Sequence, residues 1–324
     1  MTETLKQPVP LTDVDGPGLT FDFPGLHIGT AEYAEGPTGA TVFHFPERAV
    51  AAVDVRGGMP GAYNVDVLRL GYDFPFLDAI TIAGGSWYGL QAAAGVAAAL
   101  KDDDIRSGDW HNLANVAGAI VYDLGDRRLT EICPDAALGA AAFRAARSGR
   151  FPLGAQGAGR MVMQGHYYGL SLHSGQGGAY RELGRTKIAA FAVTNPLGVL
   201  VDRAGGIVTG GAPLPGVGSI HDLLGRLPLV RDAMGVAQPG QVGGPAGGSA
   251  NPANTTISVV VTNQIMPLYA IQRMAYQVHG SMGRAIQPFA TASDGDVLFA
   301  ASTHAVENPD LHPMEVAALA SEVM

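Results

Sequence analysis

The sequence predicts an α/β fold with one large apolar core, and three observations support this prediction. Hydrophobic residues make up 47% of the 324 positions, which is enough to fill a substantial core. Glycine accounts for 45 positions, about twice its usual share, and these glycines are scattered among apolar runs, as tight turns and close backbone approaches require. Segments with strand and helix character also alternate along the chain, which is typical of α/β proteins.

The first two thirds of the chain contain short runs that are rich in β-branched or aromatic residues and bounded by turn signals, which predict strands. These runs are residues 42–45, 49–55, 119–123, 188–193 and 197–201. Between the second and the third of them, residues 86–101 predict a helix, because apolar side chains recur there at helical spacing. The predicted buried stripe of this helix comprises Leu90, Ala94, Val96 and Leu100.

The last third begins with a proline- and glycine-rich segment at residues 210–254, which predicts an exposed connector. The residues that follow it, 255–262, have the composition of a buried strand. The remaining predicted elements are a helix at 267–284, a strand at 296–301 and a helix at 314–324. A flexible segment thus meets a rigid strand directly before Thr255.

Charge and composition exclude several kinds of partner. The formal net charge is −9 and the chain has no run of lysine or arginine, so the electrostatic footprint of nucleic-acid binding is missing. No window reaches the ~18 apolar residues of a membrane span, and the first residues lack the apolar stretch of a secretory signal, so we expect a cytoplasmic protein. Charged residues make up only 15%, which predicts surface buried between subunits and therefore a homo-oligomer.

The sequence indicates neither a disulfide framework nor a metal site. Cys133 is the single cysteine, so it cannot form an internal disulfide, and we expect it to be a buried structural thiol. No spacing of cysteine and histidine resembles a zinc site. We accordingly expect activity without a metal ion or an organic cofactor.

Thr255 stands where the connector meets the predicted strand, and its chemistry depends on whether the chain is cut before it. A hydroxyl inside a chain is a weak nucleophile, but a free α-amine, with a pKa of about 7.7 to 8.0, can act as its base. In the uncut chain the same hydroxyl can attack the carbonyl of Asn254 and form an ester that water opens. Thr255 is therefore a candidate N-terminal nucleophile, although its position alone favours a buried strand threonine bonded to the backbone.

Asp294 and Asp296 lie two residues apart at a turn that enters a predicted strand. Alternation along a strand sends such side chains to the same face, so both carboxylates could face one site. Two close carboxylates cannot both ionise freely, which raises one pKa and lets the pair hold a proton beside Thr255. The spacing alone more often indicates an Asp-Gly turn with a solvated or calcium-binding aspartate pair.

Several segments together resemble one known family. In the last third they are NTTISVVVTN at 254–263, QVHGSM at 277–282, IQPF at 286–289 and DGDVLFA at 294–300. Earlier in the chain they are FDFPG at 21–25, EGPTGAT at 35–41, AGGSWYG at 83–89, AIVYD at 119–123 and NPLG at 195–198. In this order they resemble the nylon-oligomer hydrolases, which are 6-aminohexanoate-oligomer endohydrolases. These enzymes belong to a self-processing family that includes L-aminopeptidase/D-esterases and β-peptidyl aminopeptidases, and the resemblance covers nearly the whole chain.

This resemblance implies an αββα sandwich like that of the N-terminal-nucleophile hydrolases. It also implies that the chain is autoprocessed into a large chain, residues 1–254, and a small chain, residues 255–324, which remain one co-folded domain. The processed heterodimers are expected to assemble further into a dimer of dimers, that is, a homotetramer.

The site residues of the family carry over by motif. Thr255 matches the nucleophile, and Asn254 matches the residue before the cut. Asp294 and Asp296 match the carboxylates that support the nucleophile. The aspartate pair also favours the endo-acting type of enzyme, because the aminopeptidase members of the family tend to place serine and glutamate at these positions.

Three further residues match positions around the site. Tyr122 and Asn195 match residues that line it, where a phenol and an amide can donate to the substrate carbonyl as it becomes an oxyanion. By themselves, Tyr122 would be a core strand aromatic and Asn195 part of an Asn-Pro turn. The nylon-oligomer hydrolases carry a lysine in the segment 157–166, at the position of His166. Histidine is a weaker base than lysine, so His166 would alter the charge around the site and thereby affect the rate and the substrate preference. Considered by itself, His166 is more often a surface or hydrogen-bonded histidine than a catalytic one.

The sequence thus predicts a self-cleaving amide hydrolase that acts on linear amides, such as 6-aminohexanoate oligomers, through an acyl-enzyme on Thr255. Three alternatives remain open. An aminopeptidase or β-peptidase of the same family would hydrolyse dipeptides with a free amine without cutting inside the oligomers. An acyltransferase of the ornithine acetyltransferase kind would transfer acetyl from acetylornithine to glutamate. A non-catalytic scaffold protein would keep the fold and stay uncut.

Overall fold

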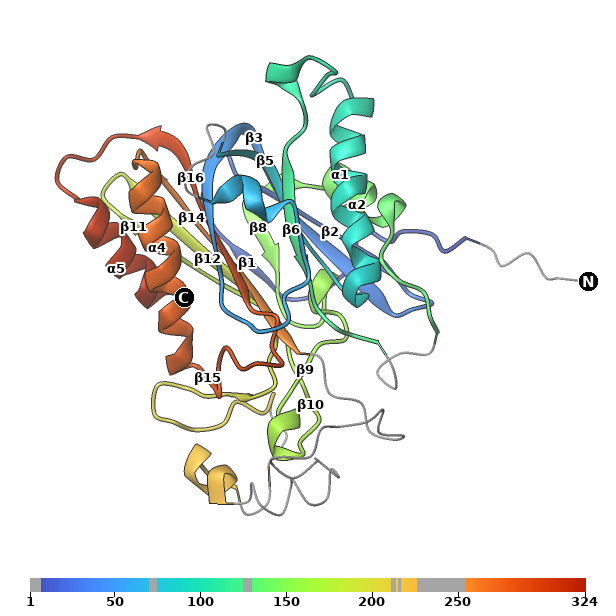
Figure 1. Cartoon of the computed structure of the whole chain (residues 1–324), viewed down its shortest axis with the longest axis vertical. Coiled ribbons are helices and arrows are strands. Elements are labelled where there is room, and N and C mark those ends of the chain that lie inside the picture. The colour runs from blue at the N-terminus through green and yellow to red at the C-terminus, as the bar shows by residue number, and fades with distance from the viewer. Residues whose placement is uncertain (1–6, 70–74, 125–129, 211–213, 215–216, 226–253) are drawn as a thin grey trace, which may run out of the picture.

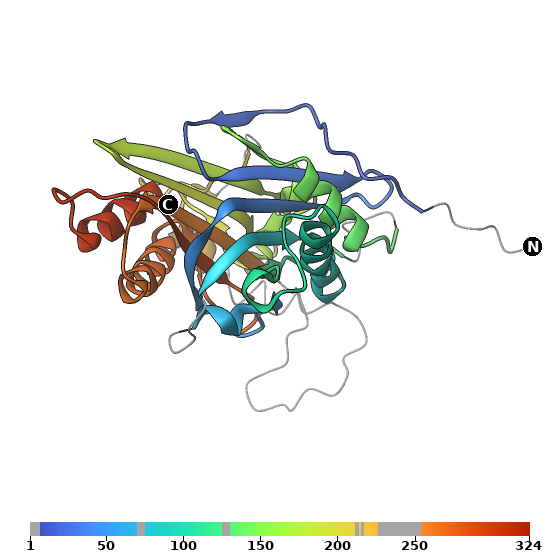
Figure 2. The ribbon, with the colours of Figure 1, turned by 90° about the horizontal axis from the view of Figure 1, so that it is seen from above.

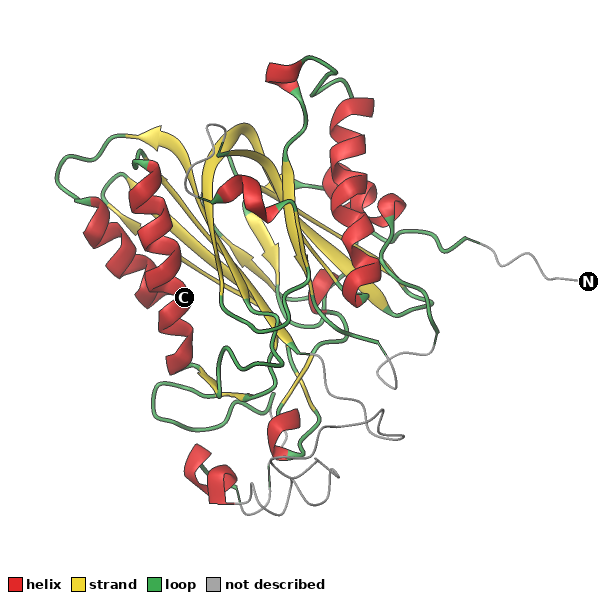
Figure 3. Cartoon of the chain, in the orientation of Figure 1, coloured by secondary structure: helices red, strands yellow, loops and turns green. Residues whose placement is uncertain are grey.

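The computed structural model describes residues 7–69, 75–124, 130–210, 214, 217–225 and 254–324 (Figure 1). Most of the connector predicted at residues 210–254 lies outside these ranges. In the described part of the chain, two pairs of helices lie on opposite sides of the strands (Figure 3).

A mixed sheet of ten strands forms the centre of the molecule. Eight of its strands follow one another in the order β11-β12-β14-β16-β3-β5-β6-β4, while β2 pairs with β3 and with β7. The pairings of β14 with β16 and of β5 with β6 are parallel, and the others are antiparallel. The bounds are β2 His27–Tyr33, β3 Thr38–Val55, β4 Ala62–Tyr63, β5 Phe76–Ala83, β6 Val116–Ile120, β7 Arg147–Ser148, β11 Gly175–Leu183, β12 Thr186–Asn195, β14 Thr255–Gln264 and β16 Val297–Val306.

The long strand β3 lets this sheet fold over into two packed layers. Its register is irregular between His44 and Ala49; the residues before this point pair with β2 and β5, and those after it pair mainly with β16. Side chains from both halves then meet in one core, where the rings of Phe43 on β3 and Phe191 on β12 lie 5.2 Å apart. The strands therefore form the two inner layers of a sandwich.

Each outer face of the folded sheet is covered by a helix pair. Helices α4 (Leu268–Ser281) and α5 (Pro313–Val323) cover β12, β14, β16 and the second half of β3. Helices α1 (Gln91–Asp102) and α2 (Ala136–Arg144) cover β2, β5, β6 and the first half of β3. Figure 2 shows the two pairs on opposite sides of the strands. The predicted αββα sandwich is thus confirmed.

The remaining described elements are short, and residues 220–225 are helical. Three two-stranded ribbons pair β1 (Gly18–Thr20) with β8 (Arg150–Pro152), β9 (Met163–Gln164) with β10 (Leu172–His173) and β13 (Val199–Leu200) with β15 (Ile286–Gln287). The 3-10 helices are η1 Val65–Leu68, η2 Ser86–Leu90, η3 Trp110–Asn112, η5 Gly157–Gly159, η6 His166–Tyr168 and η7 Met282–Arg284.

Several predicted elements were wrong in their limits. The runs at 42–45 and 49–55 are one strand, because the irregularity in β3 bends the strand without ending it. The helix predicted at 86–101 begins with the 3-10 turn η2, and Ala94 is exposed because Ala92 and Ala93 lie on the buried side of the helix instead. The run at 197–201 contains only the short β13.

Cys133 is half-buried and not fully buried as expected, because it lies in a loop before α2 and not in a core element. None of the helices in the described ranges is long and apolar enough to cross a membrane.

Candidate active site

Thr255 is the first residue of β14, and the strand pairings bring the other candidate residues to it. On one side Thr255 pairs with Asn195, the last residue of β12. On the other side Asn254 forms a parallel bridge with Asp294, just before β16 begins. Because β14 and β16 are parallel, their N-terminal ends lie at the same edge of the sheet. This pairing is the reason why Thr255 and the aspartate turn meet.

The carbonyl oxygen of Asn254 accepts two hydrogen bonds. The hydroxyl of Thr255 donates one at 2.5 Å, and the backbone N–H of Gly295 donates the other at 2.8 Å. A β-carbon at position 295 would lie 2.6 Å from the Thr255 hydroxyl oxygen, so this position needs glycine. The Thr255 side chain is only 4% exposed in the uncut chain. The carbonyl before Thr255 is therefore polarised, while the hydroxyl is covered from solvent.

Asp294 and Asp296 are both buried and are held by different donors. Asp294 accepts from the backbone N–H of Leu197 at 3.1 Å and from both the N–H and the hydroxyl of Thr291, at 3.0 and 2.6 Å. Asp296 accepts from the N–H of Thr256 at 2.6 Å and from that of Ala290 at 3.1 Å. Among the described residues no lysine, arginine or histidine forms an ion pair with either carboxylate.

Burial, together with the nearby charge of Asp294, raises the pKa of Asp296 to about 7. The hydrogen bonds from Thr256 and Ala290 oppose this rise only in part. A carboxyl group that titrates near neutral pH can give and take a proton, which is the property of a general acid or base. The aspartate turn therefore offers a proton-transfer group directly beside the backbone of Thr255.

A backbone loop that the sequence analysis did not single out closes over the aspartate turn. The N–H groups of Arg56 and Gly57 donate to the carbonyl of Asp296, and that of Met59 donates to the carbonyl of Asp294 at 2.8 Å. A β-carbon on Gly57 would lie 2.2 Å from the nitrogen of Asp296, so only glycine allows this approach. The adjacent glycines at 57 and 58, directly after a strand, were the available signal.

Asn195 is fully buried and connects two segments. Its side-chain oxygen accepts from the N–H of Met163 at 3.0 Å, and its amide nitrogen donates to the carbonyl of Tyr122 at 3.1 Å. The structure thus brings Asn195 and the backbone of Tyr122 together beside Thr255. The predicted run at 119–123 is a strand only as far as Ile120, so Tyr122 lies in the segment after β6, where its side chain is half-buried.

His166 begins the 3-10 helix η6 and is half-buried. Its two neighbours in sequence bind the turn after Asn195. The N–H of Gly165 donates to the carbonyl of Gly198 at 2.7 Å, and the N–H of Tyr167 donates to the carbonyl of Leu197 at 2.9 Å. Because Leu197 also donates to Asp294, the backbone around His166 belongs to the same hydrogen-bonded assembly as the aspartate turn.

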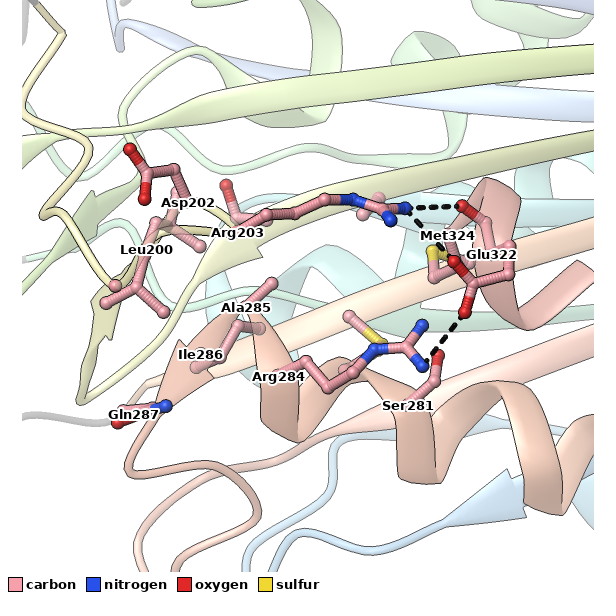
Figure 4. Close-up of a pocket in the computed structure, with 15 residues that line it drawn as sticks. Leu200, Asp202, Arg203, Ser281, Arg284, Ala285, Ile286, Gln287, Glu322 and Met324 are labelled. Atoms are coloured by element: carbon pink, nitrogen blue, oxygen red, sulfur yellow. Dashed lines mark hydrogen bonds and ion pairs between the residues drawn. The ribbon is translucent and has the colours of Figure 1, made fainter.

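A separate cavity of about 660 Å³ lies on the other face of the sheet (Figure 4). Thr194 lines it, whereas Asn195, the next residue of β12, points to the opposite face with Thr255. At the cavity, Arg203 and Arg284 each pair with Glu322 at 3.2 Å. Its position behind the strand separates this cavity from the residues around Thr255.

An αββα sandwich with a threonine at the start of a central strand and two buried carboxylates beside it is the arrangement of an amide hydrolase with an N-terminal nucleophile. The comparisons with known proteins place the chain among the amide hydrolases. It matches peptidase family S58 over residues 19–324 and belongs to that family.

The most similar relatives include two 6-aminohexanoate-oligomer endohydrolases. The one from Kocuria sp. (strain KY2) is 40% identical over 98% of this chain and 86% of its own length. The one from Paenarthrobacter ureafaciens is 41% identical over 94% of this chain and 83% of its own length. The family resemblance predicted from the sequence is thus confirmed, and the chain is an amide hydrolase.

Solved structures with low sequence identity share the fold. The β-aminopeptidase from Burkholderia sp. superposes with a TM-score of 0.61 at 17% identity, covering 95% of this chain and 86% of its own. The L-aminopeptidase D-Ala-esterase/amidase from Ochrobactrum anthropi, described as a variant of the Ntn hydrolase fold, gives a TM-score of 0.62 at 17% identity, covering 96% and 85%.

Proposed function

We propose that the chain cuts itself between Asn254 and Thr255 and then hydrolyses linear amides, such as 6-aminohexanoate oligomers, with Thr255 as the nucleophile. One observation carries this proposal: the Thr255 hydroxyl and the Gly295 N–H both donate to the Asn254 carbonyl, next to Asp294 and Asp296. The relatives named above supply the substrate class.

Self-cleavage follows from this contact. The Thr255 oxygen attacks the Asn254 carbonyl carbon and passes its proton to a nearby base, and the carbonyl oxygen becomes an oxyanion. The Gly295 N–H already points at that oxygen and stabilises the charge as it develops. The carbon–nitrogen bond then breaks with proton transfer to nitrogen, and water opens the resulting ester. The products are a carboxylate at Asn254 and a free amine on Thr255.

Substrate hydrolysis repeats these steps on a foreign amide. The freed amine of Thr255 takes the proton of the hydroxyl as it attacks, because an α-amine, whose ordinary pKa is about 7.7 to 8.0, can act as a base near neutral pH. The leaving amine takes a proton, an acyl-enzyme remains, and water releases the acid. Asp296 is placed to relay a proton, because it binds the N–H of Thr256 at 2.6 Å. Tyr122 and Asn195 are the proposed donors to the substrate oxyanion, and His166 is proposed to tune the charge around them.

The strand order supports a processed protein whose two parts remain one co-folded domain. Residues 255–324 contribute β14 and β16, which lie between β12 and β3 of residues 1–254. We further propose that the processed protein is cytoplasmic and forms a homo-oligomer, a dimer of dimers. The low content of charged residues supports surface buried between subunits. Light scattering on the purified protein gives the assembly directly.

Intact-mass spectrometry of the purified protein tests self-cleavage. The parent protein is expected to give two chains of about 26 and about 7 kDa, in proportion to their lengths within 33.4 kDa. Thr255→Ala is expected to stay intact, and Thr255→Ser, which keeps a hydroxyl, is the matched control that still cleaves. A single full-length chain in the parent after long incubation at neutral pH would contradict the proposal.

A substrate panel separates the two amide-hydrolase candidates. Cleavage inside N-acylated 6-aminohexanoate oligomers supports the endohydrolase, because such substrates have no free amine. Hydrolysis restricted to dipeptides with a free amine would instead assign the protein to the aminopeptidases, which are its neighbours in fold.

A further inference from the structure

We propose that the indole of Trp87 is the surface on which the methylene chain of the substrate lies, with the side chain of Met59 beside it, and that Trp87 is therefore a specificity-determining residue. This inference rests on the proposed function, since it concerns what Thr255 acts on. It is drawn from two close backbone approaches that connect Trp87 to the nucleophile through one loop.

The first approach joins the nucleophile to this loop. The β-carbon position of Gly295 lies 2.6 Å from the Thr255 hydroxyl oxygen, 2.8 Å from the carbonyl oxygen of Met59 and 3.4 Å from Cα of Pro60. Because both oxygens lie within 2.8 Å of the same point, the Thr255 hydroxyl oxygen and the Met59 carbonyl oxygen are close to each other. The backbone at residues 59–60 is therefore a direct neighbour of the reacting hydroxyl.

The second approach joins the same loop to Trp87. A β-carbon on Gly61 would lie 3.1 Å from Cδ1 of Trp87 and 2.5 Å from Cδ1 of Ile120. The indole thus lies against the backbone of Gly61, two residues after Met59. Glycine at this position leaves room for the ring.

The 3-10 turn that carries Trp87 is fixed to the segment of Tyr122. The N–H of Ser86 donates to the carbonyl of Val121 at 3.1 Å, and the N–H of Gly85 donates to the carboxylate of Asp123 at 2.7 Å. The carbonyl of Tyr122 in turn accepts from Asn195, the strand partner of Thr255. Trp87 is therefore held in a defined position relative to the nucleophile.

Trp87 and Met59 are both exposed. Trp87 is 66% exposed and Met59 is 51% exposed, whereas Ile120, which also lies against Gly61, is buried. Two large apolar side chains are thus exposed on the loop next to Thr255 and on the turn that packs against this loop, where they offer contact to an apolar ligand. The 6-aminohexanoate repeat is a run of methylene groups between amides, so it fits this surface better than the short, polar backbone of an α-peptide.

The chain contains two tryptophans, which provides a matched control. Trp110 is 71% exposed and also lies on a 3-10 helix, but it precedes the start of β6, whereas Val121 and Tyr122 follow its end. The five residues of β6 separate these two ends by about 17 Å. Trp110 thus matches Trp87 in chemistry and exposure but not in location.

Fluorescence tests the contact independently of turnover. In the processed Trp110→Phe protein Trp87 is the only tryptophan, and its emission is expected to change on rapid mixing with linear 6-aminohexanoate trimer. In Trp87→Phe, where only Trp110 emits, no change is expected. Equal responses from both variants, or a response only from Trp110, would overturn the proposal.

Steady-state kinetics tests the specificity. Trp87→Ala is expected to raise KM for the trimer about tenfold, as the loss of contact with one or two methylene groups implies, and to change KM for a β-alanine amide by less than about twofold. Trp110→Ala is expected to change neither value. Circular dichroism and thermal unfolding check that Trp87→Ala is folded.

The outcomes distinguish this inference from the function on which it rests. If the parent protein neither cleaves itself nor hydrolyses any amide, the proposed function fails. If it does both, and Trp87→Ala has the parent KM for the trimer, the proposed function stands and the role of Trp87 is wrong.

Discussion

Buried carboxylates occur at two kinds of place in this molecule, and their partners differ. Asp78 on β5 is fully buried and is neutralised by Arg106 at 2.6 Å and Arg48 at 3.1 Å. Asp294 and Asp296 are equally buried, but in the described structure their hydrogen bonds come only from uncharged N–H and O–H groups. The first arrangement stabilises an anion permanently, whereas the second leaves two anions in competition and keeps a proton available near neutral pH.

Asp54 is a second aspartate that is paired with a cation. Burial alone would raise the pKa of Asp54, but the hydrogen bonds and charges of His279 and Arg56 outweigh it and hold this pKa below its ordinary value. Asp54 lies only two residues before Arg56, whose N–H donates to the Asp296 carbonyl. The two kinds of carboxylate are thus close neighbours, and the charge of the partner, not the depth of burial, sets them apart.

Removal of one uncompensated carboxylate is expected to have the largest effect. Asp296→Asn cannot transfer a proton, so self-cleavage and amide hydrolysis should each slow by about 10³-fold. The fraction of cut chain against time, measured by mass spectrometry, gives the first rate, and oligomer hydrolysis gives the second. Asp310→Asn, at an exposed position, is the control with the parent rates. Parent rates in Asp296→Asn would show that the uncompensated pair has no part in the chemistry.

The cation-paired carboxylate should behave in the opposite way. Asp78→Asn leaves two arginines without their counter-charge and is expected to lower the free energy of unfolding by about 3 kcal/mol, because breaking a buried ion pair leaves uncompensated charge. Denaturant unfolding measures this loss. At a temperature where the variant is folded, its rate of self-cleavage should match the parent. If Asp78→Asn cleaved itself slowly but unfolded like the parent, the two kinds of carboxylate would not differ in role as described.

The smallest expected effect is on the pH dependence of the free energy of unfolding, with and without the Asp296 carboxyl. Since the pKa of Asp296 is raised to about 7, the native state retains a proton between about pH 4 and 7 that the unfolded state has lost. The stabilisation by this group is therefore full at low pH and falls as pH rises through that range. Between pH 5 and 8 the uncut Thr255→Ala protein should lose about 2 to 3 kcal/mol relative to the same protein carrying Asp296→Asn, in denaturant titrations at each pH. Parallel pH profiles of the two proteins would contradict the raised pKa.

Much of the candidate site could be predicted because its parts lie in short, recognisable segments. Thr255 begins a strand of strongly apolar composition, and Asp294 and Asp296 flank a glycine before the next strand. The structure places these residues side by side, and Asn195 pairs directly with Thr255. The αββα fold was likewise predicted from the family motifs, while the strand and helix patterns alone gave only its α/β class.

Other features could not be predicted, because they depend on contacts between distant backbones. The loop at residues 57–59 closes over the aspartate turn through N–H and carbonyl groups, which every residue carries and no side-chain pattern reveals. The prediction that Ala94 is buried is wrong, because alanine is small enough for either side of a helix. The sequence predicts two strands where β3 is one, because a local irregularity resembles a turn in sequence.

If the chain is processed as proposed, the position of β14 and β16 in the middle of the sheet has a consequence for refolding. Before cleavage the chain folds in a unimolecular reaction, with these strands already tethered to β12 and β3. After cleavage the same native structure must be recovered from two separate polypeptides, so its recovery depends on their concentration. The proposed processing therefore predicts that the cut protein, once unfolded in dilute solution, regains its structure far less readily than the uncut chain, so that folding has to precede the cut.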